Sequence, residues 1–247
     1  MSREKNIQKF NSDVIANAGY VYTSDDRLSS RLANERLSEA VRRITRLEGK
    51  RIIDIGCGDG EYTIELLASG PAYVLGVDAA KSAVDSAAKK ASKEGSRNIE
   101  FRVMDFYKLK TMRERFDIAI VRGVLHHLYD LEKAIAAISG IADEVVIIEP
   151  NGYNPVLKVI EKTSKYHREH EEKSYPPSRL DRYFEKQGGR VMESFYCGLV
   201  PFFCPDPLAK VLKFLEPVVE KVPVVKQLSC AVYVLKVGFD RRKIKDR

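Results

Sequence analysis

The sequence of 247 residues contains no tryptophan, only four cysteines and no long apolar run. The cysteines are scattered at positions 57, 197, 204 and 230, and none of them forms a Cys-x-x-Cys pair. We therefore predict neither a disulfide framework nor a metal site. A membrane-spanning helix is also not expected, because no stretch of about eighteen consecutive apolar residues occurs.

The polar first residues lead into no apolar segment of the kind found in secretory signals, so a cytoplasmic location is expected. The net charge of +7 would suit an anionic partner, such as RNA or an acidic membrane surface. Many soluble enzymes carry as much charge, so nucleic acid is permitted as a partner but not favoured. The length and the 44% hydrophobic content fit one large α/β domain with its own core.

The central hundred residues alternate between short β-branched runs and helical patterns. Strands are predicted at 51–55, 73–78, 99–103, 116–121 and 144–148, with helices at about 61–68, 81–93 and 131–141. Alternation of this kind indicates right-handed βαβ units and a parallel sheet. The nearly continuous apolar strands are typical of a sheet covered on both faces.

Other patterns flank this core. A helix is predicted from about Asn11 to Leu47, ended by Gly49. Further helices are expected from about Pro155 and over 178–186, with Ser178 as N-cap, and two more strands at 190–197 and 230–237. We divide the single domain into a helical cover (1–48), a cofactor-binding core (49–150), substrate-side insertions with the last two strands (151–237) and a basic tail (238–247).

A glycine loop follows the first predicted strand. Gly56, Gly58 and Gly60 would allow a tight turn, close approach of a ligand to the backbone, and free helix N–H groups aimed at that ligand. Asp78 ends the next strand, about twenty residues further on, where such folds place the carboxylate that binds ribose hydroxyls. The strand, the helix and this acid make the glycine signal specific.

The loop departs from the dinucleotide pattern Gly-x-Gly-x-x-Gly, and an acid, Asp54, precedes its first glycine. A carboxylate in that place suits a cationic amino-acid group better than a pyrophosphate. S-adenosylmethionine has an ammonium group, a sulfonium, a ribose and an adenine, and it lacks phosphate. The loop therefore favours S-adenosylmethionine over NAD.

Residues Arg51–Pro150 resemble the class I S-adenosylmethionine-dependent methyltransferases. The resemblance covers the glycine motif and three further segments: Gly76-Val77-Asp78, Val103-Met104-Asp105-Phe106, and Phe116–Ile120 running into Leu125-His126-His127-Leu128. Within that class the chain is most similar to the small-molecule branch that includes quinone-biosynthesis methyltransferases. The resemblance implies a Rossmann-like, doubly wound, mostly parallel seven-stranded sheet with helices on both faces and an antiparallel last strand.

The resemblance also implies roles for individual residues. Asp54 and the loop Gly56-Cys57-Gly58-Asp59-Gly60 would line the methionine end, and Asp78 would hold the ribose with Ala79 beside the adenine. Asp105 would accept a hydrogen bond from the adenine amino group, with Phe106 following it. Arg122 would lie near the methionine portion and bind the cofactor carboxylate or an acidic substrate. S-adenosylhomocysteine would be the product.

Simpler structural roles stay open for the same residues. Asp54 or Asp78 could cap the helix that follows it, and Asp105 could be a strand-end turn residue. Arg122 could form an ordinary salt bridge. Cys57 fits a small packing residue better than a nucleophile.

Methyl transfer from a sulfonium is an in-line displacement, so the protein mainly aligns the reactants and excludes water. A base is needed only where the acceptor must lose a proton, and no obligatory triad is expected. His126 and His127 follow the fourth strand and are candidates for that base, with structural roles as the alternative. Tyr22 and Tyr153 are candidates for substrate contact.

The acceptor must be inferred from the remaining sequence. The fourth strand leads into no Asn/Asp-Pro-Pro-Tyr motif, which weakens amino-nitrogen methylation of bases or glutamine. Residues 198–205 are apolar. With the amphipathic stretch 208–215 they could line a pocket, rest peripherally on a membrane surface, or simply pack on the sheet edge. We predict an S-adenosylmethionine-dependent methyltransferase with a small, hydrophobic or lipid-like acceptor. The alternatives are an RNA or protein methyltransferase and a non-catalytic S-adenosylmethionine-binding partner.

Overall fold

The computed structural model describes residues 8, 11–12, 27–164 and 173–240 of the chain. Tyr22, predicted to contact substrate, lies outside these residues. Among the described residues, no helix is both long enough and apolar enough to cross a membrane.

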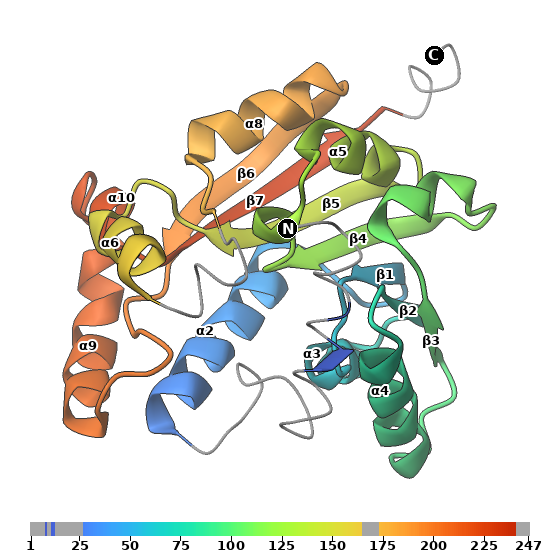
Figure 1. Cartoon of the computed structure of the whole chain (residues 1–247), viewed down its shortest axis with the longest axis horizontal. Helices are drawn as coiled ribbons and strands as arrows, with labels where there is room; N and C mark the ends of the chain where they lie inside the picture. The colour runs from blue at the N-terminus through green and yellow to red at the C-terminus, as the bar shows by residue number, and fades with distance from the viewer. Residues whose placement is uncertain (1–7, 9–10, 13–26, 165–172, 241–247) are drawn as a thin grey trace.

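Seven strands form one sheet in the order β3-β2-β1-β4-β5-β7-β6 (Figure 1). Strands β1 to β5 pair in parallel, whereas β7 pairs antiparallel with both β5 and β6. The predicted fold class is therefore confirmed. The strand bounds are β1 Arg51–Ile55, β2 Tyr73–Asp78, β3 Ile99–Val103, β4 Phe116–Arg122, β5 Ala142–Pro150, β6 Gly189–Cys197 and β7 Val232–Phe239.

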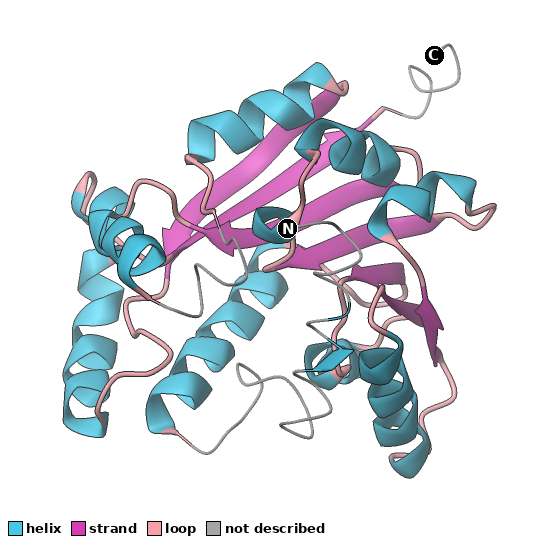
Figure 2. Cartoon of the chain, in the orientation of Figure 1, coloured by secondary structure: helices cyan, strands magenta, loops and turns pink. Residues whose placement is uncertain are grey.

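Helices cover both faces of this sheet (Figure 2). The α-helices are α2 Leu28–Ile44, α3 Glu61–Glu65, α4 Lys81–Lys93, α5 Leu131–Ser139, α6 Pro155–Thr163, α8 Pro177–Lys186, α9 Asp206–Val219 and α10 Val225–Ser229. Short 3₁₀ helices are η2 Leu66–Ser69, η3 Phe106–Thr111 and η4 Leu125–His127.

Two predicted helix ends are wrong. Helix α2 ends at Ile44 because Thr45 is extended, and Gly49 makes a later turn with φ of 68°. Helix α8 starts at Pro177, with Pro176 rather than Ser178 at the N-cap. Proline fits the first helical turn because the N–H that it lacks would have no partner inside the helix.

The alternation of the strands divides the core into two layers. On β1, Ile53 and Ile55 pack with the apolar residues of α5 and α8, whereas Ile52 packs with α2. Asp54 shares the face of Ile52, and Arg122 on β4 shares that of Ile118 and Ile120, because side chains alternate along a strand. The sequence register therefore turns both Asp54 and Arg122 toward α2.

The strand order reverses between β1 and β4, and ligands of open α/β sheets bind outside the carboxyl ends of the strands at such a point. Strand β6 runs parallel to β1–β5, since both β5 and β6 oppose β7. The segment between β6 and β7, which includes α9 and α10, therefore leaves and returns at the same edge as the glycine loop.

Candidate functional site

The glycine loop after β1 is folded tightly over the end of β2. Gly56, Gly58 and Gly60 have φ of 78°, 55° and 80°, values that side chains rarely tolerate. The N–H of Gly56 donates to the carbonyl of Val77 at 2.7 Å. A Cβ atom on Gly56 would lie 2.3 Å from a methyl of Val124, so only glycine fits this turn.

Asp78 joins the glycine loop to the helix that follows β2. One carboxylate oxygen accepts from the N–H of Gly58 at 3.0 Å, and the other accepts from the N–H of Ala80 at 2.8 Å. Burial raises the pKa of Asp78, and these backbone donors oppose the rise. The side chain is half-buried, and Ala79 beside it is also partly exposed. The carboxylate thus binds the N–H of Ala80, the residue before α4, but α4 has no side-chain cap, and binding of ribose hydroxyls stays a prediction.

Asp54 is a buried acid at the end of β1. Its carboxylate accepts a hydrogen bond of 2.5 Å from the hydroxyl of Thr63 on α3. Burial raises the pKa of Asp54 to about 6, although the Thr63 bond and the charge of Arg122 lower it. A cationic group placed beside this carboxylate would therefore relieve a desolvated negative charge.

Arg122 connects the end of β4 to α2. Its guanidinium donates to the Ser38 hydroxyl at 3.2 Å and to the Asn34 side-chain oxygen at 3.0 Å. It also lies 3.6 Å from the ring centroid of Tyr62, and burial lowers the pKa of Arg122. These contacts are those of a residue that positions α2, while binding of a cofactor carboxylate or acidic substrate stays a prediction.

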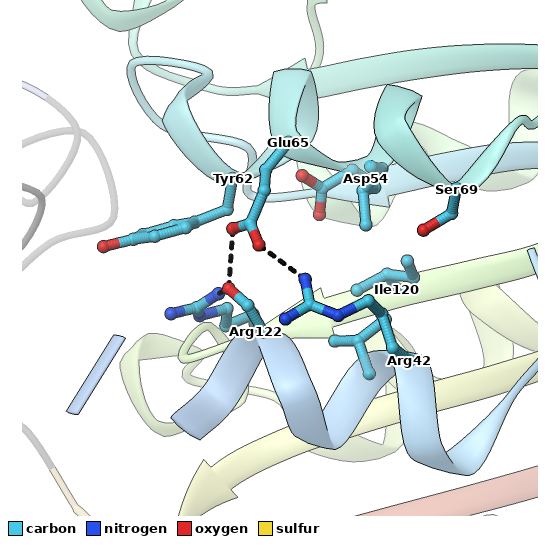
Figure 3. Close-up of a pocket in the computed structure, with 10 residues that line it drawn as sticks. Arg42, Asp54, Tyr62, Glu65, Ser69, Ile120 and Arg122 are labelled. Atoms are coloured by element: carbon cyan, nitrogen blue, oxygen red, sulfur yellow. Dashed lines mark hydrogen bonds and ion pairs between the residues drawn. The ribbon is translucent and has the colours of Figure 1, made fainter. Parts of the chain in front are cut away.

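A small cavity lies between α2, α3 and the sheet (Figure 3). Asp54, Tyr62 and Arg122 line it, together with Glu65, which accepts hydrogen bonds from Ser38 and Arg42. Its volume of about 20 Å³ holds about one water molecule and no nucleoside. Beside this cavity, the hydrogen bonds of Glu65 join α3 to α2.

The other predicted cofactor residues surround the same edge. Asp105 accepts from the N–H of Tyr107 at 2.9 Å and so caps η3. Phe106 is buried in the core beneath it. Burial raises the pKa of Cys57 well above its usual value, which fits the packing interpretation and not a nucleophile.

His126 is held by a buried carboxylate that the sequence reasoning did not single out. Glu149, at the end of β5, is 1% exposed, and one of its oxygens lies 2.8 Å from Nδ1 of His126. The same carboxylate accepts from the backbone N–H groups of Val124, Leu125 and His126. Glu149 thus fixes both the β4–α5 loop and the direction of the imidazole ring.

The His127 ring lies against that of His126, with ring centroids 3.9 Å apart and an interplanar angle of 44°. The Glu149 carboxylate holds the His126 ring of this pair through its Nδ1 atom. A histidine whose Nδ1 is held by a carboxylate is the usual arrangement of an oriented general base. This difference favours His126 over His127 for proton transfer.

Tyr153 lies in the loop after β5 and is 38% exposed. Its hydroxyl donates to the Ser178 hydroxyl at 2.7 Å, and its backbone N–H donates to the side chain of Asn151. Tyr153 therefore joins the β5 loop to α8 at the carboxyl edge of the sheet. Contact with substrate stays a prediction.

Two further contacts were missed. The Asn11 side-chain oxygen accepts from the N–H of Ser82 at 3.0 Å, which brings the N-terminal part of the chain to the first turn of α4. Thr63 supports Asp54. Only Glu149 had a sequence signal, since an acid that ends an apolar buried strand needs a partner.

Among the described residues, no group of three or more histidine, cysteine or acidic residues could hold a metal ion.

The sheet order, the glycine loop and the acids at the carboxyl ends of β1, β2 and β3 define the Rossmann-like class of S-adenosylmethionine-dependent methyltransferases. A family model described as "Methyltransferase domain" matches residues 47–196, and the chain belongs to that family. The predicted class is thereby confirmed.

Curated relatives resemble a shorter part of the chain. The ubiquinone biosynthesis O-methyltransferase of Coxiella burnetii is 36% identical over 89 residues, which cover 36% of this chain and 37% of the relative. The human EEF1A lysine methyltransferase 2 is 36% identical over 72 residues, which cover 29% of this chain and 30% of the relative. The match thus spans only about a third of each relative.

A solved structure matches nearly the whole chain. Magnesium protoporphyrin IX methyltransferase from Synechocystis PCC 6803, solved with bound S-adenosylhomocysteine, superposes with a TM-score of 0.69 at 15% identity. The match covers 97% of this chain and 100% of that one. At this identity the likeness establishes the fold alone.

Proposed function

We propose that the chain transfers a methyl group from S-adenosylmethionine to a small hydrophobic acceptor. The proposal rests on the cradle, by which we mean Gly56, Gly58 and Asp78. The two glycines have positive φ, and their N–H groups donate to Val77 and to Asp78 at the end of β2. When bound, S-adenosylmethionine supplies an activated methyl group on its sulfonium. Asp54 is the buried carboxylate that would neutralise the ammonium of the methionine end.

An oxygen acceptor fits the side chains beyond β4 best. A hydroxyl becomes a strong nucleophile when a positioned base removes its proton. The Glu149 carboxylate orients His126, so a proton taken from the acceptor would enter the ring at Nε2 and be balanced by the buried carboxylate. The likeness to an O-methyltransferase of ubiquinone biosynthesis supports the same acceptor atom.

A macromolecular acceptor is the second candidate. The net charge of +7 suits RNA, and the human relative is a lysine methyltransferase by name. An RNA acceptor would show binding that weakens steeply with salt, because basic side chains displace counterions from phosphates. A protein acceptor would retain label in the protein fraction of an extract.

The cofactor site is tested by isothermal calorimetry with S-adenosylmethionine. We expect binding by the wild type and at least about a hundredfold loss in Asp78→Ala, because the cradle loses the carboxylate that links it to α4. Asp85→Ala is the matched control, since Asp85 lies on α4 and forms only an exposed ion pair with Lys81. A wild type that binds no cofactor would refute the proposal.

The acceptor is tested with methyl-labelled S-adenosylmethionine and a cell extract. The extract is separated afterwards into lipid, small-molecule, RNA and protein fractions. Label in the lipid or small-molecule fraction supports the hydrophobic acceptor, and label in RNA or protein replaces it with the second candidate. Cofactor binding without label in any fraction indicates a non-catalytic binding protein.

A further inference from the structure

An exposed apolar face, formed by α6, α9 and α10, lies beyond the carboxyl end of β6 (Figure 1). Helix α10 contacts both α6 and α9. We define this face by the most exposed apolar side chains of these helices and of the connection between α9 and α10. They are between 41% and 82% exposed: Val156, Val159, Leu208, Val211, Phe214, Leu215, Val218, Val222, Val224, Val225 and Leu228. We propose that this face binds the surface of an anionic lipid bilayer.

Helix α9 carries its apolar stripe on the wrong side for a helix that only packs on its own domain. Its buried residues are Ala209 and Glu216, which mark the face turned toward the protein. Val211, Phe214 and Val218 recur at helical spacing on the opposite face, and Phe214 is 82% exposed. A helix on the surface of a domain that is surrounded by water usually has polar side chains on its outward face.

The charges of the same helices are sorted by sign. Glu216 and Glu220 turn inward, where they accept hydrogen bonds from Leu199 and Gly198 and, for Glu220, from Arg36. On the three helices, among the residues described, Asp206 is the only exposed carboxylate. Among the described residues of these helices and the turn that follows α9, the exposed lysines are Lys162, Lys210 and Lys221.

An apolar stripe bordered by lysines fits a bilayer with acidic headgroups better than it fits a second copy of a basic protein. The side chains of the stripe would enter the region between headgroups and acyl chains, and each lysine would meet the negative surface potential. A second copy with a net charge of +7 would instead bring lysines against lysines across a twofold interface.

Hydrogen bonds from the loop after β5 fix the position of this face relative to the sheet. Asn151 donates to the carbonyls of Gln227 and Cys230, and Asn154 donates to that of Ser229, so the loop after β5 holds the end of α10. That loop follows Glu149 directly. Docking of the face would bring the carboxyl edge of the sheet to the lipid, a consequence that rests on the proposed hydrophobic acceptor.

Cosedimentation with phosphatidylcholine vesicles, with and without phosphatidylglycerol, tests the proposal on the full chain. We expect the wild type to pellet with the anionic vesicles and far less with the neutral ones. The variant Val211→Ser/Phe214→Ser/Val218→Ser should lose about tenfold or more of its partition coefficient. Lys210→Glu/Lys221→Glu should lose about tenfold on anionic vesicles only.

Matched controls separate these effects from general surface changes. Met192→Ser removes a side chain of similar exposure, 54%, from edge strand β6 outside the face, and Lys89→Glu/Lys93→Glu reverses two exposed lysines on α4. Both should bind vesicles like the wild type. Sedimentation-velocity runs without lipid should show the same species for the wild type and the triple serine variant.

Two outcomes would overturn the inference. One is equal absence of the wild type from both pellets, and the other is a wild-type dimer that the serine substitutions dissociate, which would make the face a self-association surface. Calorimetry with S-adenosylmethionine on the same preparations keeps the proposed function separate. Asp78→Ala should still bind vesicles, and the triple serine variant should still bind the cofactor.

Discussion

Two parts of the carboxyl edge of the sheet are held in different ways. The glycine loop and Asp78, which we propose bind the methyl donor and call the donor side, are held by backbone groups. Helices α9 and α10 with the loop after β5, which we call the acceptor side, are held by side chains. On the donor side, glycines with positive φ let the loop after β1 donate directly to the carbonyl of Val77, and Asp78 accepts only from backbone N–H groups. On the acceptor side, α9 and α10 are attached through Arg36 to Glu220 and through Asn151 to the end of α10.

This difference has a chemical meaning. A site that binds one unchanging ligand benefits from rigid backbone donors that cannot rotate, because preorganisation avoids an entropic cost at binding. A site whose ligand differs among relatives can change its shape when a few side-chain hydrogen bonds, such as those that hold α9 and α10, are replaced. Substitutions on each side of the edge, and at His126 between them, test whether the two sides are independent.

The largest effect is expected where the two sides meet, at His126. His126→Asn should lower the rate constant of methyl transfer by about a hundredfold or more, since a positioned base contributes roughly 10² to 10⁴. The affinity for S-adenosylmethionine should be unchanged. His127→Asn is the comparison, because the Glu149 carboxylate holds the ring of His126, and it should cost less than about tenfold. Single-turnover rates with the labelled extract fraction measure both, and equal losses would contradict a base role for His126.

On the donor side, Gly56→Ala should lower the free energy of unfolding by about 2–4 kcal/mol. The substitution combines a left-handed φ of 78° with a Cβ placed 2.3 Å from Val124, so strain and overpacking add. Gly49→Ala has a similar φ of 68° with open space around it, and should cost only about 1 kcal/mol. Urea unfolding measures both.

Rescue sharpens this prediction. Adding Val124→Ala to Gly56→Ala removes the methyl contact but leaves the backbone strain, so the double variant should recover only part of the loss. Full additivity of the two substitutions would show that the loop moves away from Val124 and that the backbone cradle is less rigid than its hydrogen bonds indicate.

The donor side was predictable because its signals are local. Asp54, the glycines and Asp78 are separated by short stretches of sequence, and parallel strands must bring their ends to one edge. The bounds of β1 and β2 follow from β-branched runs, and both match the prediction. The end of α2 was misjudged because Thr45 leaves the helix four residues before the glycine that was expected to end it.

The acceptor side was less predictable because its contacts join distant segments. Glu149 and His126 are 23 residues apart, and Arg36 and Glu220 are 184 apart. An amphipathic pattern on 208–215 shows that a helix has an apolar face, but not whether that face packs or stays exposed. The burial of Ala209 and Glu216 reveals that the apolar side of α9 points outward.

The attachment of the acceptor side is tested at Glu220. Glu220→Ala should lower the free energy of unfolding by about 2–3 kcal/mol, because it leaves the buried guanidinium of Arg36, 8% exposed, without its closest partner. Glu39→Ala is the matched control: Glu39 also pairs with Arg36, but it is 56% exposed, so its loss should cost less than about 0.5 kcal/mol. Cofactor affinity should be unchanged in both, and a large loss of cofactor affinity in Glu220→Ala would show that the two sides are coupled.

The smallest effect is a pH dependence on the donor side. Burial raises the pKa of Asp54 to about 6, so the folded protein without ligand is increasingly protonated there below that pH. If the ammonium of S-adenosylmethionine binds the carboxylate form, affinity should increase by about tenfold from pH 5 to pH 7 and level off above. Asp54→Asn should bind more weakly at pH 7 and show a flatter pH profile, whereas Asp85→Asn should retain the wild-type profile.

The same raised pKa has the opposite sign for stability. Between the usual pKa of aspartate and about 6, the folded state binds more protons than the unfolded state, so the free energy of unfolding should fall as pH rises through that window and then stay level. Asp54→Asn should therefore be more stable than the wild type at pH 8 and lose that advantage near pH 4, as urea unfolding at both pH values would measure. A buried carboxylate destabilises the free protein because its charge has lost water. The same carboxylate strengthens the binding of a cation that takes the place of that water. A pH-independent affinity in the wild type would remove Asp54 from the cofactor contacts while leaving Asp78 and the glycine cradle in place.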